Sequence, residues 1–140
     1  MRDIFGAIFP ISPENVSSLF NQKKSAFIKF TKFKKLQRGS KIVFYTCKKL
    51  VGEGIIEKVE RVEPKIAWSH YGKQIFLNEN QYSKYTARSP ISGEDRKMTQ
   101  ITIFFLKSLK RYKNPIRCIY NVTPAGRYLT QVEYQRIGKK

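Results

Sequence analysis

The sequence predicts an α+β fold, in which about six strands form a mixed, strongly curled sheet or small barrel with two or three short helices. Short runs rich in β-branched and aromatic residues recur between turn residues, as strands do. Helix-start signals separate some of these runs. The chain has 140 residues, of which 41% are apolar, so we expect residues 1–140 to form a single domain.

The first half of the chain begins with a strand that is followed by a helix. Ser12 suits the capping position of this helix, and Pro13 suits its first turn. An apolar stripe at helical spacing then starts at Val16. The strands predicted in this half cover residues 3–9, 26–30, 41–47 and 50–62.

The second half is predicted to begin with two helices and to end with strands. A helix fits residues 64–71, and Asn78 with Gln81 three residues later opens another. Residues 89–95 are predicted to form a loop, because a proline and a glycine there disfavour regular structure. The strands predicted in this half cover residues 98–109, 116–122 and 128–132, and prolines flank the middle one.

Two glycines flank an acidic residue in the strand over residues 50–62. Gly52 and Gly54 lack side chains, so this place suits a β-bulge or the close approach of another backbone or a ligand. The Glu53 carboxylate between them either accepts a hydrogen bond from a base amino group or neutralises a nearby lysine. The residues alone leave both interpretations open.

The charge of the chain is its most informative feature for function. The formal net charge is +18 and the pI is about 10.1. Two long segments contain no Asp or Glu: residues 15–52, which hold ten Lys or Arg, and residues 96–132, which hold eight. Apolar residues are interleaved with these cations, so both segments can fold and present their charge on a surface. Such a basic and aromatic surface suits a polyphosphate backbone with bases to stack.

Other features argue against membrane, metal and cofactor functions. No apolar stretch is long enough to span a bilayer, and the start of the chain lacks the layout of a signal peptide. Cys47 and Cys118 lie far apart and His70 is the single histidine, so no metal-ligand spacing occurs. We therefore expect a cytoplasmic protein with no cofactor, no metal and no membrane partner, whose oligomeric state stays open.

Three segments carry a family resemblance. They are KKLQRGSKIVFYTCKKLVGEGIIEKVERV (residues 34–62), GAIFPISPENVSSLFNQKKSAFIKF (residues 6–30) and NPIRCIYNVTPAGRYL (residues 114–129). Together they resemble the PUA-like superfamily, which includes the PUA, ASCH, EVE and YTH domains. The third is similar to the closing segment of an uncharacterised, mainly archaeal PUA-like family.

The resemblance implies a PUA-like pseudo-barrel that binds RNA or, in some relatives, modified nucleotides. The chain departs from the ASCH pattern, which favours a Glu and an Arg on the second strand. Here that strand carries Lys29 and no acid. An ASCH-type nucleotide contact or nuclease role is therefore not carried over to this chain.

Phosphate contacts are expected from cations of the second strand, of the turns after it and of the last third of the chain. Lys29 is the sharpest candidate, because strand alternation sets its side chain opposite that of Ile28. The competing interpretation is a solvated face on which lysines cover aromatic rings. The candidate contacts are Lys23, Lys24, Lys29, Lys32, Lys34, Lys35, Arg38, Lys48, Lys49, Arg117 and Arg127.

A small cleft beside the basic strand is expected to accept a base or a chain end. Tyr45 suits stacking on a base and, equally well, a half-buried packing position. Trp68 is interpreted as a packing residue rather than the wall of an aromatic cage. The residues predicted to line the cleft are Tyr45, Gly52, Glu53, Tyr120 and Tyr128.

The sequence thus predicts a protein that binds nucleic acid, with structured RNA favoured over DNA. One alternative is a reader of modified nucleotides or bases. Another is a nuclease-like enzyme that uses Glu53 or Glu57, which is less favoured because acids spaced along a strand more often form a solvated face. A third is a subunit whose basic face meets an acidic protein.

Overall fold

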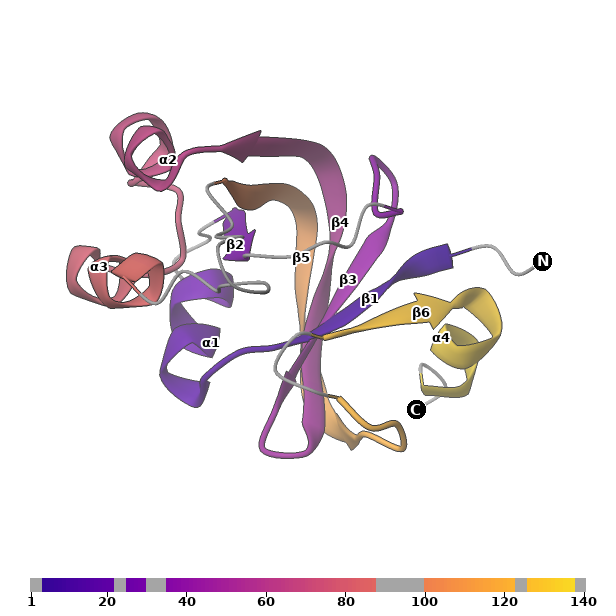
Figure 1. The fold of residues 1–140 in the computed structure, drawn as a ribbon. Coiled ribbons are helices and arrows are strands. Elements are labelled where there is room, and N and C mark those ends of the chain that lie inside the picture. Colours follow the sequence, from indigo (N-terminus) through magenta and orange to yellow (C-terminus); the bar gives the residue numbers. More distant parts are fainter. Residues whose placement is uncertain (1–3, 22–24, 30–34, 88–99, 123–125, 138–140) are drawn as a thin grey trace, which may run out of the picture.

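The computed structural model describes residues 4–21, 25–29, 35–87, 100–122 and 126–137 (Figure 1). Its strands are β1 (Ile4–Pro10), β2 (Ala26–Lys29), β3 (Lys41–Thr46), β4 (Lys49–Val62), β5 (Ile101–Arg117) and β6 (Arg127–Thr130). Its helices are α1 (Pro13–Phe20), α2 (Pro64–Tyr71), α3 (Glu79–Ala87) and α4 (Gln131–Ile137). The predicted α+β fold is confirmed, with four helices in the described part where two or three were expected.

The strands form one mixed, six-stranded sheet in the order β2-β5-β4-β3-β1-β6. The β1–β3 pair is parallel, and the other neighbouring pairs are antiparallel. Figure 1 shows β4 and β5 curving together along the sheet, with α1, α2 and α3 on one side and α4 at the far end. The last strand lies beside the first, so the end of the chain completes the sheet.

The main hydrophobic core lies between the sheet and the first three helices. Phe27 of β2 is at its centre, with ring centroids 5.1–6.4 Å from those of Phe9, Phe44, Phe76 and Phe104. All five rings are buried, so the core consists largely of aromatic contacts that bury extensive apolar area.

A second, smaller cluster lies on the opposite face of the sheet, beneath α4. It contains Ile8, Val43, Leu50, Leu129 and Ile137, all buried. Ile8 of β1 points to this face because its neighbours Ala7 and Phe9 point to the main core. Both faces of the central strands are therefore covered, which explains why these strands read as continuous apolar runs.

The glycine pair in β4 forms the predicted bulge. The pairing of β4 with β5 shifts between Leu50 and Gly52 and again between Glu53 and Ile55. At the start of β4, Cys47 and Lys48 have φ angles of 52° and 66° and form the tight turn from β3. Both irregularities lie at the same end of the β3–β4 hairpin.

Two strand predictions were wrong in the last third of the chain. Instead of a separate strand over residues 116–122, β5 continues through Pro115 to Arg117. Leu50 pairs with Ile116 while Gly52 pairs with Arg111, so Pro115 lies in a bulge where its missing N–H breaks no ladder bond.

The final strand also ends earlier than predicted, at Thr130, and α4 replaces the rest of residues 128–132. Thr130 and Glu133 cap this helix reciprocally: the Glu133 N–H donates to Thr130 Oγ1 (3.2 Å), and the Thr130 N–H donates to Glu133 Oε1 (2.9 Å). The same signal was recognised at Asn78 and Gln81, where the structure confirms it with bonds of 2.8 and 3.0 Å.

Replacing Gly6 with alanine should destabilise the fold strongly, because an added Cβ would collide with the Lys41 carbonyl in the β1–β3 pair. We expect the free energy of unfolding, measured by urea titration, to fall by about 3 kcal/mol or more. Gly39→Ala is the matched control: it has a φ of 94° but no atom within 4 Å of the new Cβ, and should cost about 1 kcal/mol. An equal loss in both variants would refute the packing argument.

Candidate nucleic-acid-binding site

A narrow cleft opens where the end of β1, the start of α1 and the end of β2 meet. Its volume is about 160 Å³. The residues that line it are Pro10, Ile11, Ser12, Asn15, Phe27, Ile28, Lys29, Phe76 and Leu77. We call it the Lys29 cleft, because among these lining residues the lysine supplies the one cationic side chain.

Lys29 is half-buried at the last position of β2, and its ammonium lies 5.8 Å from the ring centroid of Phe9. Burial lowers the pKa of Lys29 below its ordinary value of 10.5. Desolvation of this kind makes the charged form costly, and the cost is recovered when an anion binds beside it. The sharpest sequence candidate thus lies in a cleft and not on an open face.

The first turn of α1 forms the opposite wall of the Lys29 cleft. The Ser12 side chain does not cap the helix as predicted; its hydroxyl accepts a hydrogen bond of 2.8 Å from Asn15 Nδ2. Asn15 is 8% exposed, so this bond holds a buried amide at the cleft. The positive end of the helix and the ammonium of Lys29 both favour an anion here.

A further cation stands near this cleft that the sequence analysis missed. Lys29 pairs with Thr102 of β5, which pairs on its other side with Arg61 of β4. Neighbouring strands lie about 4.8 Å apart, so the backbones of Lys29 and Arg61 are roughly 10 Å apart. Arg61 directly follows an acidic segment in the sequence, so the charge pattern did not identify it as part of a basic surface.

The other predicted phosphate contacts are spread over several elements. Lys35 and Arg38 are exposed after β2, Lys48 and Lys49 are exposed at the β3–β4 turn, and Lys49 pairs with Arg117 of β5. Lys23, Lys24, Lys32 and Lys34 lie outside the described residues. The first and second acid-free runs therefore meet at the β3–β4 turn.

Arg38 and Arg127 lie outside the Lys29 cleft, in different surroundings. Arg38 lines a groove of about 720 Å³ with Glu57, Lys58 and Tyr71. Arg127 forms an ion pair of 2.7 Å with Glu133, and its guanidinium lies 4.6 Å from the ring centroid of Tyr120. Arg127 is thus already engaged with α4 and an aromatic ring.

The predicted cleft residues do not line the Lys29 cleft. Tyr45 and Tyr120 are half-buried beside the second cluster, and Tyr128 packs against the main core, where its hydroxyl accepts a bond of 3.2 Å from the Lys35 N–H. Gly52 has no space for a ligand, because an added Cβ would lie 2.7 Å from the Lys110 carbonyl oxygen and collide with the Phe20 ring.

Glu53 is the centre of a polar network on the second face of the sheet. Its Oε2 accepts a bond of 2.8 Å from Lys41 Nζ, and its Oε1 accepts bonds from the hydroxyls of Tyr112 (2.7 Å) and Tyr134 (2.8 Å). Lys41 also donates to the Tyr134 hydroxyl at 3.0 Å. The network connects β3, β4, β5 and α4 through one carboxylate, and the structure thus pairs Glu53 with a lysine.

The electrostatics of this network favour the charged pair. Burial alone would raise the pKa of Glu53, but the bonds from Lys41, Tyr112 and Tyr134 outweigh it and hold the pKa below 4.5. Burial would likewise lower the pKa of Lys41, yet its bonds to Glu53 and Tyr134 raise that pKa. Burial first, and then the bond to Glu53, raise the pKa of Tyr112. Lys41 and Glu53 are therefore both ionised at neutral pH.

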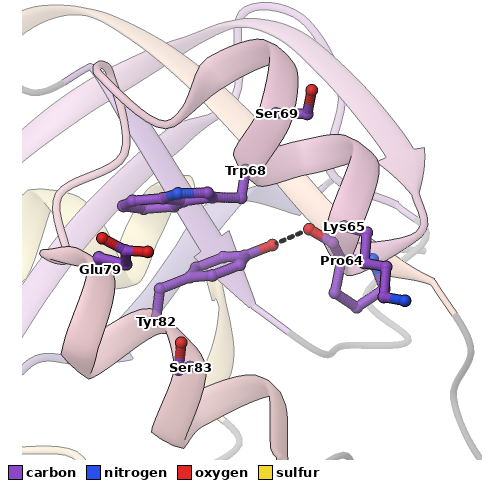
Figure 2. A pocket seen from close by; sticks show the side chains of 7 residues that line it. All are labelled: Pro64, Lys65, Trp68, Ser69, Glu79, Tyr82 and Ser83. Atoms are coloured by element: carbon purple, nitrogen blue, oxygen red, sulfur yellow. Dashed lines mark hydrogen bonds between the residues drawn. The ribbon is translucent and has the colours of Figure 1, made fainter.

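A third pocket lies between α2 and α3 and has a volume of about 290 Å³ (Figure 2). Its wall contains Trp68 and Tyr82, whose rings stack on each other with centroids 4.8 Å apart, while the Tyr82 hydroxyl donates to the Pro64 carbonyl. Burial raises the pKa of Tyr82 to about 12. One ring face of Trp68 is thus covered by Tyr82, so the tryptophan joins the two helices as the packing interpretation expected.

Metal-ligand clusters and membrane-spanning helices are both absent from the described residues. No three His, Cys, Asp or Glu side chains in the described ranges gather in a way that could hold a metal ion. Within the same part of the chain, no helix has the length and apolar content needed to cross a bilayer.

Replacing Glu53 with glutamine should leave the half-buried Lys41 ammonium without its counter-ion and lower the free energy of unfolding by roughly 3 kcal/mol at pH 7. Because the folded pKa of Glu53 is depressed, its contribution is present above the unfolded value near 4.5 and is lost as the pH falls through the folded value. Urea titrations between pH 7 and pH 3 should therefore show that the free energy of unfolding falls more steeply on acidification for the wild type than for Glu53→Gln. The exposed control Glu57→Gln should stay within about 0.5 kcal/mol of wild type; a comparable loss there would contradict the account.

Sequence comparisons find a matching family model and a similar archaeal protein. The model of a family described as "Domain of unknown function (DUF365)" matches residues 4–131. An uncharacterized protein from the archaeon Methanocaldococcus jannaschii is 31% identical over 107 residues, which cover 71% of this chain and 98% of that protein.

Solved structures show the same fold. A serine-to-alanine variant of an ASCH protein from Zymomonas mobilis superimposes with a TM-score of 0.70 and 23% identity, covering 99% of this chain and 97% of that chain. The N-terminal domain of McrB from Staphylothermus marinus gives a TM-score of 0.58 and 16% identity over 100% and 98% of the two chains. The resemblance to PUA-like, ASCH-related domains is confirmed at the level of the fold. The chain belongs to the family described as a domain of unknown function, DUF365.

Proposed function

We propose that this protein binds nucleic acid, with RNA favoured over DNA, through the Lys29 cleft and the basic surface around it. The observation that carries the proposal is the half-buried ammonium of Lys29 in a narrow cleft, opposite the first turn of α1. A cation with a depressed pKa in such a place is strongly stabilised by an anionic ligand. A phosphate group or a chain end is the ligand of the right charge and size.

A polymeric anion is favoured over a small one because of the surroundings of the cleft. The net charge of +18 creates a field that attracts polyanions, and many of the cations are exposed. Arg61 stands next to it across β5, and Lys35 follows β2. Binding of several phosphates by such cations releases counter-ions, which supplies affinity without sequence recognition.

RNA is favoured over DNA by the polar groups of the α1 wall. Ser12 and Asn15 place a hydroxyl and a buried amide in the Lys29 cleft, close to each other. Such groups can donate to and accept from a ribose 2′-hydroxyl, which DNA lacks. Comparing RNA and DNA of one sequence at one salt concentration tests this preference directly.

The described residues give the alternatives less support. Glu53 accepts three hydrogen bonds and lies on the second face of the sheet, while Glu57 is exposed in the groove with Arg38, so no carboxylate pair is poised for catalysis among them. Trp68 can offer a modified base only the ring face that Tyr82 does not cover, so these two rings do not enclose a base between them. A basic face that meets an acidic protein would not require a cleft at Lys29.

Replacing Lys29 with methionine should weaken RNA binding, because methionine keeps much of the apolar volume and removes the charge. One charge-assisted contact contributes about 1.5–3 kcal/mol, so we expect roughly 10- to 100-fold weaker binding of a short single-stranded RNA in fluorescence anisotropy. The matched control is Lys84→Gln on α3, which removes the same formal charge from an exposed position and should change the affinity less than about twofold. Equal effects of the two substitutions would show that only net charge matters.

The depressed pKa of Lys29 gives a second test. RNA affinity should be complete below the pKa of Lys29 in the free protein and should fall as the pH rises above it, earlier than an ordinary lysine with a value of 10.5 would cause. Anisotropy titrations from pH 7 upward should show this fall for the wild type at a pH below 10.5. Lys29→Arg, whose guanidinium stays protonated, should hold its affinity constant. A parallel decline in both proteins would assign the pH dependence to other groups.

A further inference from the structure

Another cavity lies where β4, β5 and the end of α2 meet, and we call it the Arg38 groove. Its volume is about 720 Å³, within the range of roughly 300–1,000 Å³ that sites for small molecules occupy. Part of its lining is apolar or aromatic, and the rest is polar. Val59, Tyr71 and Phe105 belong to the first part, and Arg38, Glu57 and Gln74 to the second.

The Arg38 groove and the Lys29 cleft use opposite faces of β5. Phe27 and Phe104 are paired and point into the main core, and Lys29, two residues after Phe27, points to the same face. Phe105 follows Phe104 and therefore points the other way. Its partner on β4 is Lys58, whose ammonium lies 4.8 Å from the centroid of the Phe105 ring. A ligand in the groove is thus held by side chains other than Lys29.

Backbone pairing sets Arg38 and Glu57 beside each other. The Gly39 N–H donates to the Ile56 carbonyl, and the Ile56 N–H donates to the Ser40 carbonyl, both at 2.8 Å. The antiparallel pairing with β4 therefore already holds in the residues before β3. Arg38 and Glu57, each one residue farther along its chain segment, occupy neighbouring positions in the lining of the groove.

The other side of the groove is held by the segment after α2. The Gln74 carbonyl accepts a bond of 2.9 Å from the Ala26 N–H. Ala26 pairs with Phe105 of β5, which pairs in turn with Lys58 of β4. Three spacings of about 4.8 Å thus separate Gln74 from Lys58, at most roughly 14 Å. The rings of Phe105 and Tyr71, with centroids 4.8 Å apart, lie within this span, so apolar surface is flanked by polar groups.

The ionised groups of the groove differ in their engagement. Lys58 forms an ion pair of 2.8 Å with Glu60, which also accepts a bond of 2.9 Å from the Tyr71 hydroxyl. None of the three ion pairs found in the described part of the chain includes Arg38 or Glu57. In a chain with 28 basic and 10 acidic residues, a carboxylate next to a guanidinium that it does not pair with is available to the hydrogen-bond donors of a ligand.

These groups indicate the chemistry of the ligand. A planar base packs its faces on apolar side chains and presents polar atoms at its edge. Guanine carries two adjacent donors, N1–H and the N2 amino group, which a carboxylate can accept with its two oxygens as it does from an arginine fork. The other bases lack this pair of donors. Guanine O6 and N7 are acceptors, which suit the Gln74 amide, and the Arg38 guanidinium suits a phosphate.

We propose that the Arg38 groove binds a guanine nucleotide, with Glu57 accepting from the base edge, Tyr71 and Phe105 packing against the base, and Arg38 binding the phosphate. This inference goes beyond the proposed function and does not depend on it, because Lys29 takes no part. A free nucleotide and a guanosine within an RNA strand present the same groups, and two kinds of probe distinguish these sources.

Titration calorimetry with GMP, IMP and AMP tests recognition of the base. The wild type should bind GMP and show no measurable affinity for AMP. IMP lacks the N2 amino group and should bind roughly 10-fold more weakly than GMP, because one bond to a charged acceptor is lost. Glu57→Gln should weaken GMP binding at least about 10-fold and remove the preference for GMP over IMP. Glu63→Gln, an exposed acid before α2, is the matched control and should change both affinities less than about twofold.

Comparison of GMP with guanosine tests the phosphate contact. Arg38→Gln should weaken GMP binding roughly 10-fold and leave guanosine binding unchanged. Arg136→Gln, which removes an exposed arginine from α4, is the matched control and should affect neither ligand. Equal losses in the two arginine variants would overturn the assignment of Arg38.

A short RNA tests the second source. Fluorescence anisotropy compares a strand of uridines that carries one central guanosine with the same strand carrying adenosine. A preference for guanosine that Glu57→Gln abolishes supports the site, and it identifies RNA as the source if GMP alone does not bind.

The inference is overturned if the wild type prefers guanine in neither kind of probe, or if a guanine preference survives Glu57→Gln. The proposed function is judged separately, by the effect of Lys29→Met on RNA binding. The substituted side chains are exposed, so all variants should share the urea unfolding midpoint of the wild type.

Discussion

The ion pair between Lys41 and Glu53 is the interaction on which the arrangement of this molecule depends. Their side chains are 18% and 12% exposed, and two tyrosine hydroxyls complete the hydrogen bonding of the carboxylate. A buried charge is tolerated only when it is paired and hydrogen-bonded, so these four side chains fix the relative positions of β3, β4, β5 and α4. Pairs of this kind contribute little net stability against an apolar alternative. Their effect is to make one arrangement of strands and helix much more stable than the alternative registers. A shift in register would leave one of the two buried charges without its partner.

That use of Glu53 has a consequence for the surface. In a chain with 28 basic and 10 acidic residues, Glu53 neutralises Lys41, and basic residues outnumber acidic ones by 18 over the whole chain. Mutual repulsion among these cations opposes folding. A polyanion relieves that repulsion, so the charge distribution that costs stability in the free protein favours association. Burial beside Phe9 lowers the pKa of Lys29, and an anion bound next to it would favour its charged form.

Local signals allowed much of the fold to be predicted from the sequence. The helix over residues 64–71, the capping pair Asn78 and Gln81, and the bulge at Gly52 each depend on neighbours within a few residues. Features formed by distant residues were missed. Nothing near Tyr134 in the sequence identifies Glu53, 81 residues away, as its partner. Pro115 ends a strand by local rules, and only the pairing with β4 shows that it stands in a bulge. The candidate site shows the same difference between local and distant signals. Lys29 was predicted from strand alternation, whereas Ser12, Asn15 and Arg61 are brought near it only by the fold.

The central claim is that the fold places Lys29 in a cleft where its ammonium contacts RNA. Acetylation of lysine amines, mapped by mass spectrometry with and without a short single-stranded RNA, measures this residue by residue. The account predicts that Lys29 loses reactivity when RNA is present, while Lys65 and Lys84 on the helical side keep theirs. Uniform protection of all three lysines, or protection confined to Lys65 and Lys84, would contradict it.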